Sequence, residues 1–213
     1  MDDSHSTLRE KRRAETQRTI QAHAVRLFTE RGYDATTVTD VAEAAGVSPM
    51  TVYRHFPTKE DLVLVDQRDR LVAERIAASS ATQPLVRRIG TALIDAATTL
   101  TGGGPEDDLT ANKQYLLARL RLMISTPALR ARHLDNHYAL QQAIVDALGG
   151  DATDPDAAFH IQAAASACLA AMHTALVRWA EDDGRTELPE LIAKALAAAF
   201  GDDIVDTGQN GRR

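Results

Sequence analysis

Residues 41–56 of the chain read VAEAAGVSPMTVYRHF, and this stretch decides the fold. Two short segments with helical periodicity flank the tetrapeptide Ala45-Gly46-Val47-Ser48. Gly46 permits a tight turn, and the small alanines let two helices cross closely. The spacing therefore predicts a helix-turn-helix. The side chains expected to pack behind it are Val38, Val41, Val47, Val52 and Phe56.

The helix starts around this stretch carry capping signals. A Ser or Thr followed three residues later by an acidic residue, or directly by proline, favours a helix N-terminus because its side-chain oxygen accepts a free backbone N–H. These signals are Thr37 with Asp40, Ser48 with Pro49, and Thr58 with Asp61. They predict the starts of the second, third and fourth helices, the fourth running to about Ala78.

The outer face of the predicted third helix is short and polar. Its residues are Met50, Thr51, Tyr53, Arg54 and His55. The major groove of B-DNA admits a helix with such a face, because its side chains can bond base edges and phosphates.

The rest of the chain shows helical periodicity without strand-like alternation, which predicts an all-α fold of about nine helices. The first helix is expected over about 12–31, and those after the fourth over 84–101, 109–125, 127–148, 155–182 and 188–200. We expect a helix-turn-helix domain with an N-terminal arm over 1–58 and a helical ligand-binding and dimerisation domain over 59–200. Residues 201–213 are expected to form a disordered tail.

Composition and charge narrow the possible functions. The 213 residues are 44% hydrophobic, and their formal charge of -6 argues against a nonspecific polycation that coats nucleic acid. The charge is uneven, because residues 9–59 hold nine Lys/Arg against six Asp/Glu while the remainder is net negative. A basic head on an acidic body can meet DNA with one end only.

The lack of a recognisable targeting signal and the single cysteine predict a cytoplasmic protein. No apolar run approaches the ~20 residues of a membrane span, and the charged first thirteen residues lack the apolar core of a signal peptide. The single cysteine, Cys168, excludes an internal disulfide framework and a cysteine-rich zinc site, and we expect it to act as a small apolar side chain. We expect no membrane contact, no metal and no cofactor.

From Arg12 to about Leu62 the sequence resembles the TetR family of transcriptional regulators. The resemblance rests on three motifs, which are F-x-x-x-G-Y/F-x-x-T-T from Phe28, A-G-V-S from Ala45, and Y-x-H-F-x-x-K-E-x-L from Tyr53. Beyond Leu62 it rests on the helical layout. It implies a DNA-binding head, a dimer, and release from DNA by a small molecule.

The resemblance also implies DNA contacts at particular residues. It makes 49–55 the recognition helix, in which Thr51 and Tyr53 contact phosphates or thymine methyl groups and His55 contacts another phosphate. Thr37 and Lys59 would bring two more helix starts to the phosphate backbone. Arg54 is the candidate for base reading, because a guanidinium can bond guanine bidentately. The full predicted set is Thr37, Ser48, Met50, Thr51, Tyr53, Arg54, His55 and Lys59, in which Met50 departs from the small residue that many relatives have.

The last two expected helices are rich in alanine, with 15 alanines among residues 155–200. The penultimate helix carries one apolar stripe through Cys168 and Trp179 and a second stripe of alanines, so it is apolar on two faces. One face would pack on the body and the other on a second subunit in a four-helix bundle, which the resemblance also implies; a monomer with a buried central helix is the alternative. The expected interface residues are Ala164, Ala167, Ala171, Ala175, Leu191 and Ala195.

Two histidines, His133 and His137, interrupt the apolar stripe of the helix expected after Pro127. They could be satisfied core or helix-end histidines, a metal pair, or part of a pocket for an organic ligand. No acidic residue accompanies them as in a His-Glu-x-x-His protease. With the resemblance, we expect an amphipathic effector bounded by Leu93, Arg119, Met123, His133 and His137.

The sequence thus predicts a dimeric repressor released from a palindromic operator by a small molecule. An activator or global regulator without a small inducer is the alternative within the same chemistry. A helical-bundle enzyme is less favoured because the sequence contains no nucleophile-base-acid set and no phosphate loop, the glycines at 102–104 not being followed by Lys-Ser/Thr. A scaffold that binds protein through the helix-turn-helix is the remaining alternative.

Overall fold

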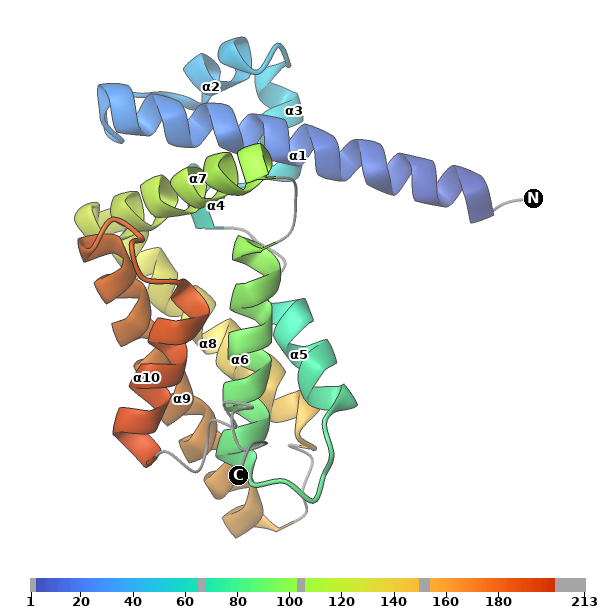
Figure 1. Ribbon diagram of the computed structural model, residues 1–213. Coiled ribbons are helices and arrows are strands. Elements are labelled where there is room, and N and C mark those ends of the chain that lie inside the picture. The colour runs from blue at the N-terminus through green and yellow to red at the C-terminus, as the bar shows by residue number, and fades with distance from the viewer. Residues whose placement is uncertain (1–2, 65–67, 103–105, 150–153, 202–213) are drawn as a thin grey trace. The chain divides into compact units, whose positions relative to one another are not determined.

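The computed structural model describes residues 3–64, 68–102, 106–149 and 154–201 (Figure 1). Within these ranges the regular structure consists of ten helices and no strand, which confirms the all-α prediction. The helices are α1 Asp3–Arg31, α2 Val38–Ala44, α3 Pro49–His55, α4 Asp61–Leu64, α5 Arg68–Ala78, α6 Leu85–Thr101, α7 Glu106–Ser125, α8 Pro127–Ala147, α9 Pro155–Glu181 and α10 Leu188–Phe200.

The described helices exceed the predicted nine by one. The fourth helix, expected from Thr58 to Ala78, is described as α4 and α5, and residues 65–67 between them lie outside the described residues. Residues 202–213 of the predicted tail also lie outside them.

The chain divides into two compact units. The first, called the head, contains residues 3–64 and 118–133, and the second, called the body, contains the remaining described residues. The helices α7 and α8 each contribute residues to both units. The sequence placed the boundary after residue 58, whereas α4 and the stretch 118–133 also belong to the head.

Helix α1 begins nine residues before the position that the sequence predicted. It starts at Asp3 instead of near Arg12, because no proline or glycine lies between residues 3 and 31 to stop the helix. The predicted apolar stripe of this helix is confirmed. Its members Ile20, Ala24, Leu27 and Phe28 are at most 2% exposed.

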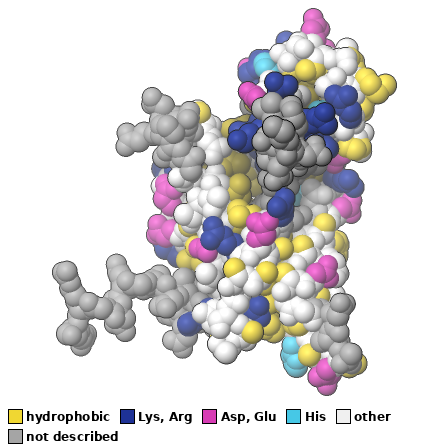
Figure 2. Space-filling view, turned by 90° about the vertical axis from the view of Figure 1, so that its right-hand side faces the viewer, with side chains coloured by type: hydrophobic (Ala, Val, Ile, Leu, Met, Phe, Trp, Pro, Cys, Tyr) yellow, Lys and Arg dark blue, Asp and Glu magenta, His cyan; other side chains and the backbone are white. Residues whose placement is uncertain are grey.

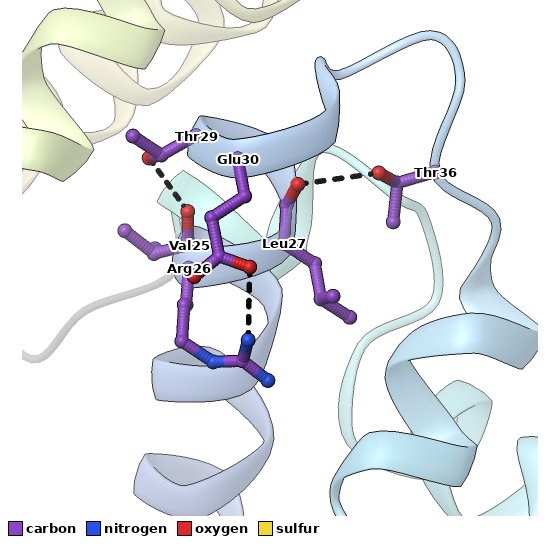
Figure 3. A network of polar contacts seen from close by, with 6 residues as sticks. All are labelled: Val25, Arg26, Leu27, Thr29, Glu30 and Thr36. Carbon is purple, nitrogen blue, oxygen red and sulfur yellow. Dashed lines mark hydrogen bonds and ion pairs between the residues drawn. The ribbon is translucent and has the colours of Figure 1, made fainter.

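The C-terminal turns of α1 are held by local polar contacts (Figure 3). The Thr29 hydroxyl donates to the Val25 carbonyl at 2.7 Å, and Arg26 pairs with Glu30 at 2.9 Å. Figure 3 also shows the buried Thr36 hydroxyl reaching the Leu27 carbonyl, at 3.4 Å. This last contact ties the loop before α2 to the end of α1, which fixes where α2 can start.

The body is built around α6, which packs on α5, α9 and α10. The predicted core stripe of α9 is buried from Ile161 to Trp179. Cys168 belongs to this stripe, and burial raises the pKa of its thiol to about 12, so it stays protonated at neutral pH. By length and composition α9 alone among the described helices could cross a membrane, but ten of its residues are buried, as in a core helix.

Candidate nucleic-acid interface

The start of α2 is fixed by a capping box. The Asp40 backbone N–H donates to the Thr37 hydroxyl oxygen at 3.1 Å, and the Thr37 backbone N–H donates to the Asp40 carboxylate at 2.7 Å. The hydrogen bonds from the Thr37 side chain and backbone lower the pKa of Asp40. Thr37, a predicted DNA contact, is exposed at this helix start.

The turn between α2 and α3 matches the predicted helix-turn-helix. Gly46 adopts φ +67°, a conformation that side chains disfavour, and the Val47 N–H donates to the Ala42 carbonyl at 3.0 Å. Ser48 then caps α3, its hydroxyl accepting from the Thr51 N–H at 3.1 Å, and Pro49 occupies the first helical turn. These local bonds set the direction in which α3 leaves the turn.

Helix α3 buries one face and exposes the other. Val52 and Phe56 are at most 1% exposed, as predicted, and anchor the helix to the core of the head. Met50 is 76% and Tyr53 49% exposed, and Arg54 is exposed as well. These three side chains therefore lie on the exposed face of α3. Figure 2 shows Lys and Arg side chains gathered on the head, at the top of the view.

The two other predicted contact residues of α3 are half-buried. The Thr51 hydroxyl lies 2.9 Å from the Ser48 hydroxyl, so these side chains orient each other. The His55 Nδ1 atom is buried without a hydrogen-bond partner among the described residues. Burial, followed by the positive charges of Arg13 and Arg54, lowers the pKa of His55, so its imidazole is neutral at pH 7.

The depressed pKa of His55 predicts a pH-dependent stability. Because the folded protein disfavours the charged imidazole, protonation of His55 lowers the free energy of unfolding. The full stability is present above the ordinary histidine pKa of about 6.5 and is lost as the pH falls through the lower folded-state pKa. The free energy of unfolding, measured by urea titration, should therefore fall more steeply between about pH 7 and 5 in the wild type than in His55→Gln. Identical pH profiles for the two proteins would contradict this assignment.

Lys59 has a structural partner that the sequence did not indicate. Its Nζ atom donates to the Tyr33 carbonyl at 2.5 Å and lies 4.1 Å from the centre of the Tyr33 ring. The Tyr33 hydroxyl donates to Glu60 at 2.9 Å, and burial, with this bond to a carboxylate, raises the pKa of Tyr33. Lys59 thus joins the end of α1 to the residues before α4. Because an ammonium has three donors, a phosphate contact by Lys59 remains a prediction.

Residues 118–133 hold α4 at both ends. The Arg119 guanidinium donates to the Val63 carbonyl and, at 3.1 Å, to the Leu64 carbonyl, which caps the C-terminal end of α4. Arg132 lies 3.5 Å from the carboxylate of Asp61, which is 5% exposed. The other oxygen of this carboxylate accepts from the Thr58 N–H at 3.0 Å, in the predicted capping box. We call Arg119, Arg132 and Asp61 the α4 clasp.

The five residues predicted to bound a ligand pocket do not lie in one compact unit. Leu93 and His137 belong to the body, while Arg119, Met123 and His133 belong to the head. Leu93 and Met123 are buried, and both histidines are half-buried with polar or electrostatic partners of their own. Arg119 has the α4 carbonyls as partners. The pocket therefore remains a prediction. Within the free protein, Arg119 serves to hold the C-terminal end of α4.

The residues predicted to form the dimer interface separate into two groups. Ala171 and Ala175 are 8% and 2% exposed, so they are covered within the single chain. Ala167 is exposed, and the other three are half-buried, namely Ala164, Leu191 and Ala195. The free face of α9 lies on the opposite side from its core stripe and carries Ala163, Ala167, Ala170 and Thr174. Ala171 and Ala175 thus pack within the single chain, and the interface as a whole remains a prediction.

A metal site finds no support in the part of the chain that the structure describes. There, no group of three or more His, Cys, Asp or Glu side chains is arranged to hold an ion.

Comparison with known proteins decides the family. Residues 20–65 match a family profile described as "Bacterial regulatory proteins, tetR family", and residues 109–200 match one described as "MftR C-terminal domain". The chain belongs to the TetR family. Members of this family are DNA-binding transcriptional regulators, which is the class that the helix-turn-helix predicted.

Individual TetR-family relatives are similar over part of their length. The regulator TcmR of Streptomyces glaucescens is 30% identical over 128 residues, which cover 60% of this chain and 56% of TcmR. The repressor KstR2 of Rhodococcus jostii is 52% identical over 40 residues, or 19% of this chain and 20% of KstR2. The matches thus span about half, or less, of the relatives' own length.

Solved TetR-family structures share the fold. A regulator from Streptomyces coelicolor A3 superposes with a TM-score of 0.51 at 24% identity, covering 90% of this chain and 94% of the other. The fatty acid degradation regulator FadR of Bacillus halodurans gives 0.53 at 17% identity, covering 92% and 97%. At these identities the likeness concerns the fold.

Proposed function

We propose that the chain is a cytoplasmic repressor that binds a palindromic DNA operator as a homodimer and is released by an amphipathic small molecule. The observation that carries the DNA-binding part is the division of α3, with Met50, Tyr53 and Arg54 exposed opposite the buried Val52 and Phe56. An exposed helix bearing a guanidinium and a phenol suits a major groove, where both can reach bases or phosphates.

The proposed contacts of the head have separate tasks. Arg54 reads a base, while Thr37, Ser48, Thr51, Tyr53, His55 and Lys59 position the head on phosphates and sugars. His55, neutral in the free protein, can donate one hydrogen bond to a phosphate. The capping boxes hold the starts of α2 and α4 in fixed directions, so their backbone N–H groups add to the phosphate contacts.

An unbiased selection tests the DNA-binding proposal. The purified protein would be incubated with random duplexes flanked by constant ends, and bound duplexes would be amplified over several rounds. The proposal expects a two-fold symmetric sequence whose half-sites are about one helical turn, ~34 Å, apart, because two heads must engage one face of the duplex. Recovery of unselected sequence would overturn it.

The proposed dimer uses the free faces of α9 and α10. On α9 the exposed small residues Ala163, Ala167, Ala170 and Thr174 allow a second helix to approach closely. On α10 the half-buried Leu191 and Ala195 extend the same kind of surface. Two copies of this helix pair would form an isologous four-helix bundle, as TetR-family regulators act as dimers.

A neighbouring pair of alanines tests this interface. Ala170→Arg places a charge on the free face of α9 and should convert the dimer to a folded monomer, measured by light scattering and circular dichroism. Ala171→Arg forces the charge into the chain's own core and should unfold the body instead. A wild-type monomer, or an unchanged dimer in Ala170→Arg, would reject the interface.

The proposed effector binds among the residues that the sequence singled out. Support comes from the family profile over residues 109–200, which includes four of the five predicted residues, and from the half-burial of both histidines. In this proposal the acceptor groups of the ligand meet Arg119, which also donates to the α4 carbonyls, or one of the two histidines.

Mass spectrometry of the purified protein in native and denaturing solution should reveal a released small molecule. A regulator without an inducer would release none, even from cells in which its operator is derepressed.

A further inference from the structure

The N-terminal turns of α1 carry basic side chains beyond the packed part of the head. Arg9, Lys11, Arg12 and Arg13 are all exposed, and the helix that bears them runs on past α3 in Figure 1. As sequence, such a basic run is more often a solvated tail than an arm that grips the minor groove. A helix, unlike a tail, gives each of these charges a fixed direction.

The helical register divides these charges between two faces. With 3.6 residues per turn, positions 9, 13, 16, 20, 24 and 27 share one side of α1. The inner members Ile20, Ala24 and Leu27 are buried in the head, Thr16 is half-buried, and Arg13 and Arg9 are exposed. The side of α1 that packs on the head thus continues outward as two arginines.

The opposite side of α1 is a mixed surface. Lys11 and Arg18 lie seven residues apart and therefore on one face, with the acidic Glu15 between them. Alternating charges of this kind are typical of a solvated helix. The arginine side is different, because Arg9 and Arg13 follow each other without an intervening acid at positions one turn apart.

Arg13 lies near the recognition helix. Its positive charge contributes to the low pKa of His55, in the last turn of α3. Arg13 is therefore within electrostatic reach of the last turn of α3, where Arg54 is exposed, and Arg9 follows about 6 Å further along α1. Successive phosphates of one strand advance about 3.4 Å along the duplex axis, so this spacing corresponds to roughly two nucleotides.

We propose that Arg9 and Arg13 form a second phosphate-binding element, which grips the duplex backbone beside the segment that α3 reads. The inference rests on the proposed DNA-binding function and extends its footprint. Each arginine displaces one condensed counterion and contacts no base. The element therefore adds affinity without adding sequence preference, which would help an acidic chain, at a formal charge of -6, to hold a polyanion.

Two double variants of equal charge test the element. Arg9→Ala with Arg13→Ala should lower the slope of log affinity against log salt by about 3.6 units on the selected duplex, because each of the two chains in the dimer loses two phosphate contacts. Lys11→Ala with Arg18→Ala removes the same charge from the opposite face and should change the slope by less than about 0.5 units. Alanine favours helix, and circular dichroism would check that α1 is retained in both.

Duplex length provides a second readout. From Arg13 to Arg9 the helix advances about 6 Å, or roughly two base pairs of duplex. Trimming the end of the duplex by two base pairs at a time should reach a length at which the wild type is weakened and the Arg9/Arg13 variant is unchanged. Equal slopes in the two double variants, or equal sensitivity to trimming, would overturn the inference while leaving the α3 contacts intact. A wild type that selects no duplex would instead reject the proposed function.

Discussion

Replacing Arg119 by methionine is expected to lower the free energy of unfolding of the head by about 2–4 kcal/mol, because two buried helix-end carbonyls lose a charged donor. Val63 and Leu64, whose carbonyls accept these bonds, are 0% and 6% exposed, so water cannot easily replace the guanidinium. Urea unfolding followed by circular dichroism measures the change. Arg119→Lys should recover part of it, since one ammonium keeps the charge without the fork that reaches both carbonyls.

Arg18→Met is the matched control for Arg119→Met. It removes the same charge from an exposed position of α1, also in the head, where a substitution changes stability by less than about 0.5 kcal/mol. If Arg119 served a ligand instead of α4, the ligand-free protein would lose no more stability in Arg119→Met than in Arg18→Met. Equal destabilisation would thus contradict the α4 clasp.

Removal of the Arg54 guanidinium is expected to relax base preference at one position of each half-site. A bidentate contact to guanine discriminates by about 1–3 kcal/mol, and the dimer loses one such contact in each half-site, so Arg54→Ala should bind the selected duplex at least about thirtyfold less tightly, with little further loss when that base pair is changed. Gel-shift titrations against single-base variants of the duplex measure this difference. The exposure of Arg54 in the free head leaves the side chain able to make the contact.

Tyr53→Ala is the companion variant. Tyr53 is proposed to position the head on the backbone, so its loss should weaken all duplexes by a similar factor and preserve the rank order of sequences. If Arg54→Ala instead weakened every sequence equally and Tyr53→Ala changed the rank order, the two roles would have to be exchanged.

Local chemistry explains why much of the head could be predicted from sequence. The capping signals at Thr37, Ser48 and Thr58 act within four residues, and each appears in the structure as the expected hydrogen bond. Gly46 has the positive φ that its turn requires. The alternation of Val52 and Phe56 with Tyr53 and Arg54 gave the buried and exposed faces of α3 by register alone.

The predictions from sequence fail where no local signal marks a helix boundary or where a distant part of the chain decides what a side chain contacts. The start of α1 was misplaced because a charged segment without caps or apolar period gives no boundary signal. The α4 carbonyls that accept from Arg119 come from 55 and 56 positions earlier in the chain, and nothing in the sequence of α7 identifies them. For Ala171 and Ala175, a helical pattern could not distinguish the chain's own core from a second subunit.

The affinity of the dimer for its selected palindrome, relative to a scrambled duplex of the same length at one salt concentration, tests the central claim most directly. Fluorescence anisotropy with end-labelled duplexes would give both dissociation constants and, at saturation, the number of chains per duplex. The account predicts two chains per duplex and a preference of at least about a thousandfold for the palindrome, as specific regulators show. Equal affinities for the two duplexes would contradict it, because exposed Tyr53 and Arg54 would then contribute charge and contact but no reading of sequence.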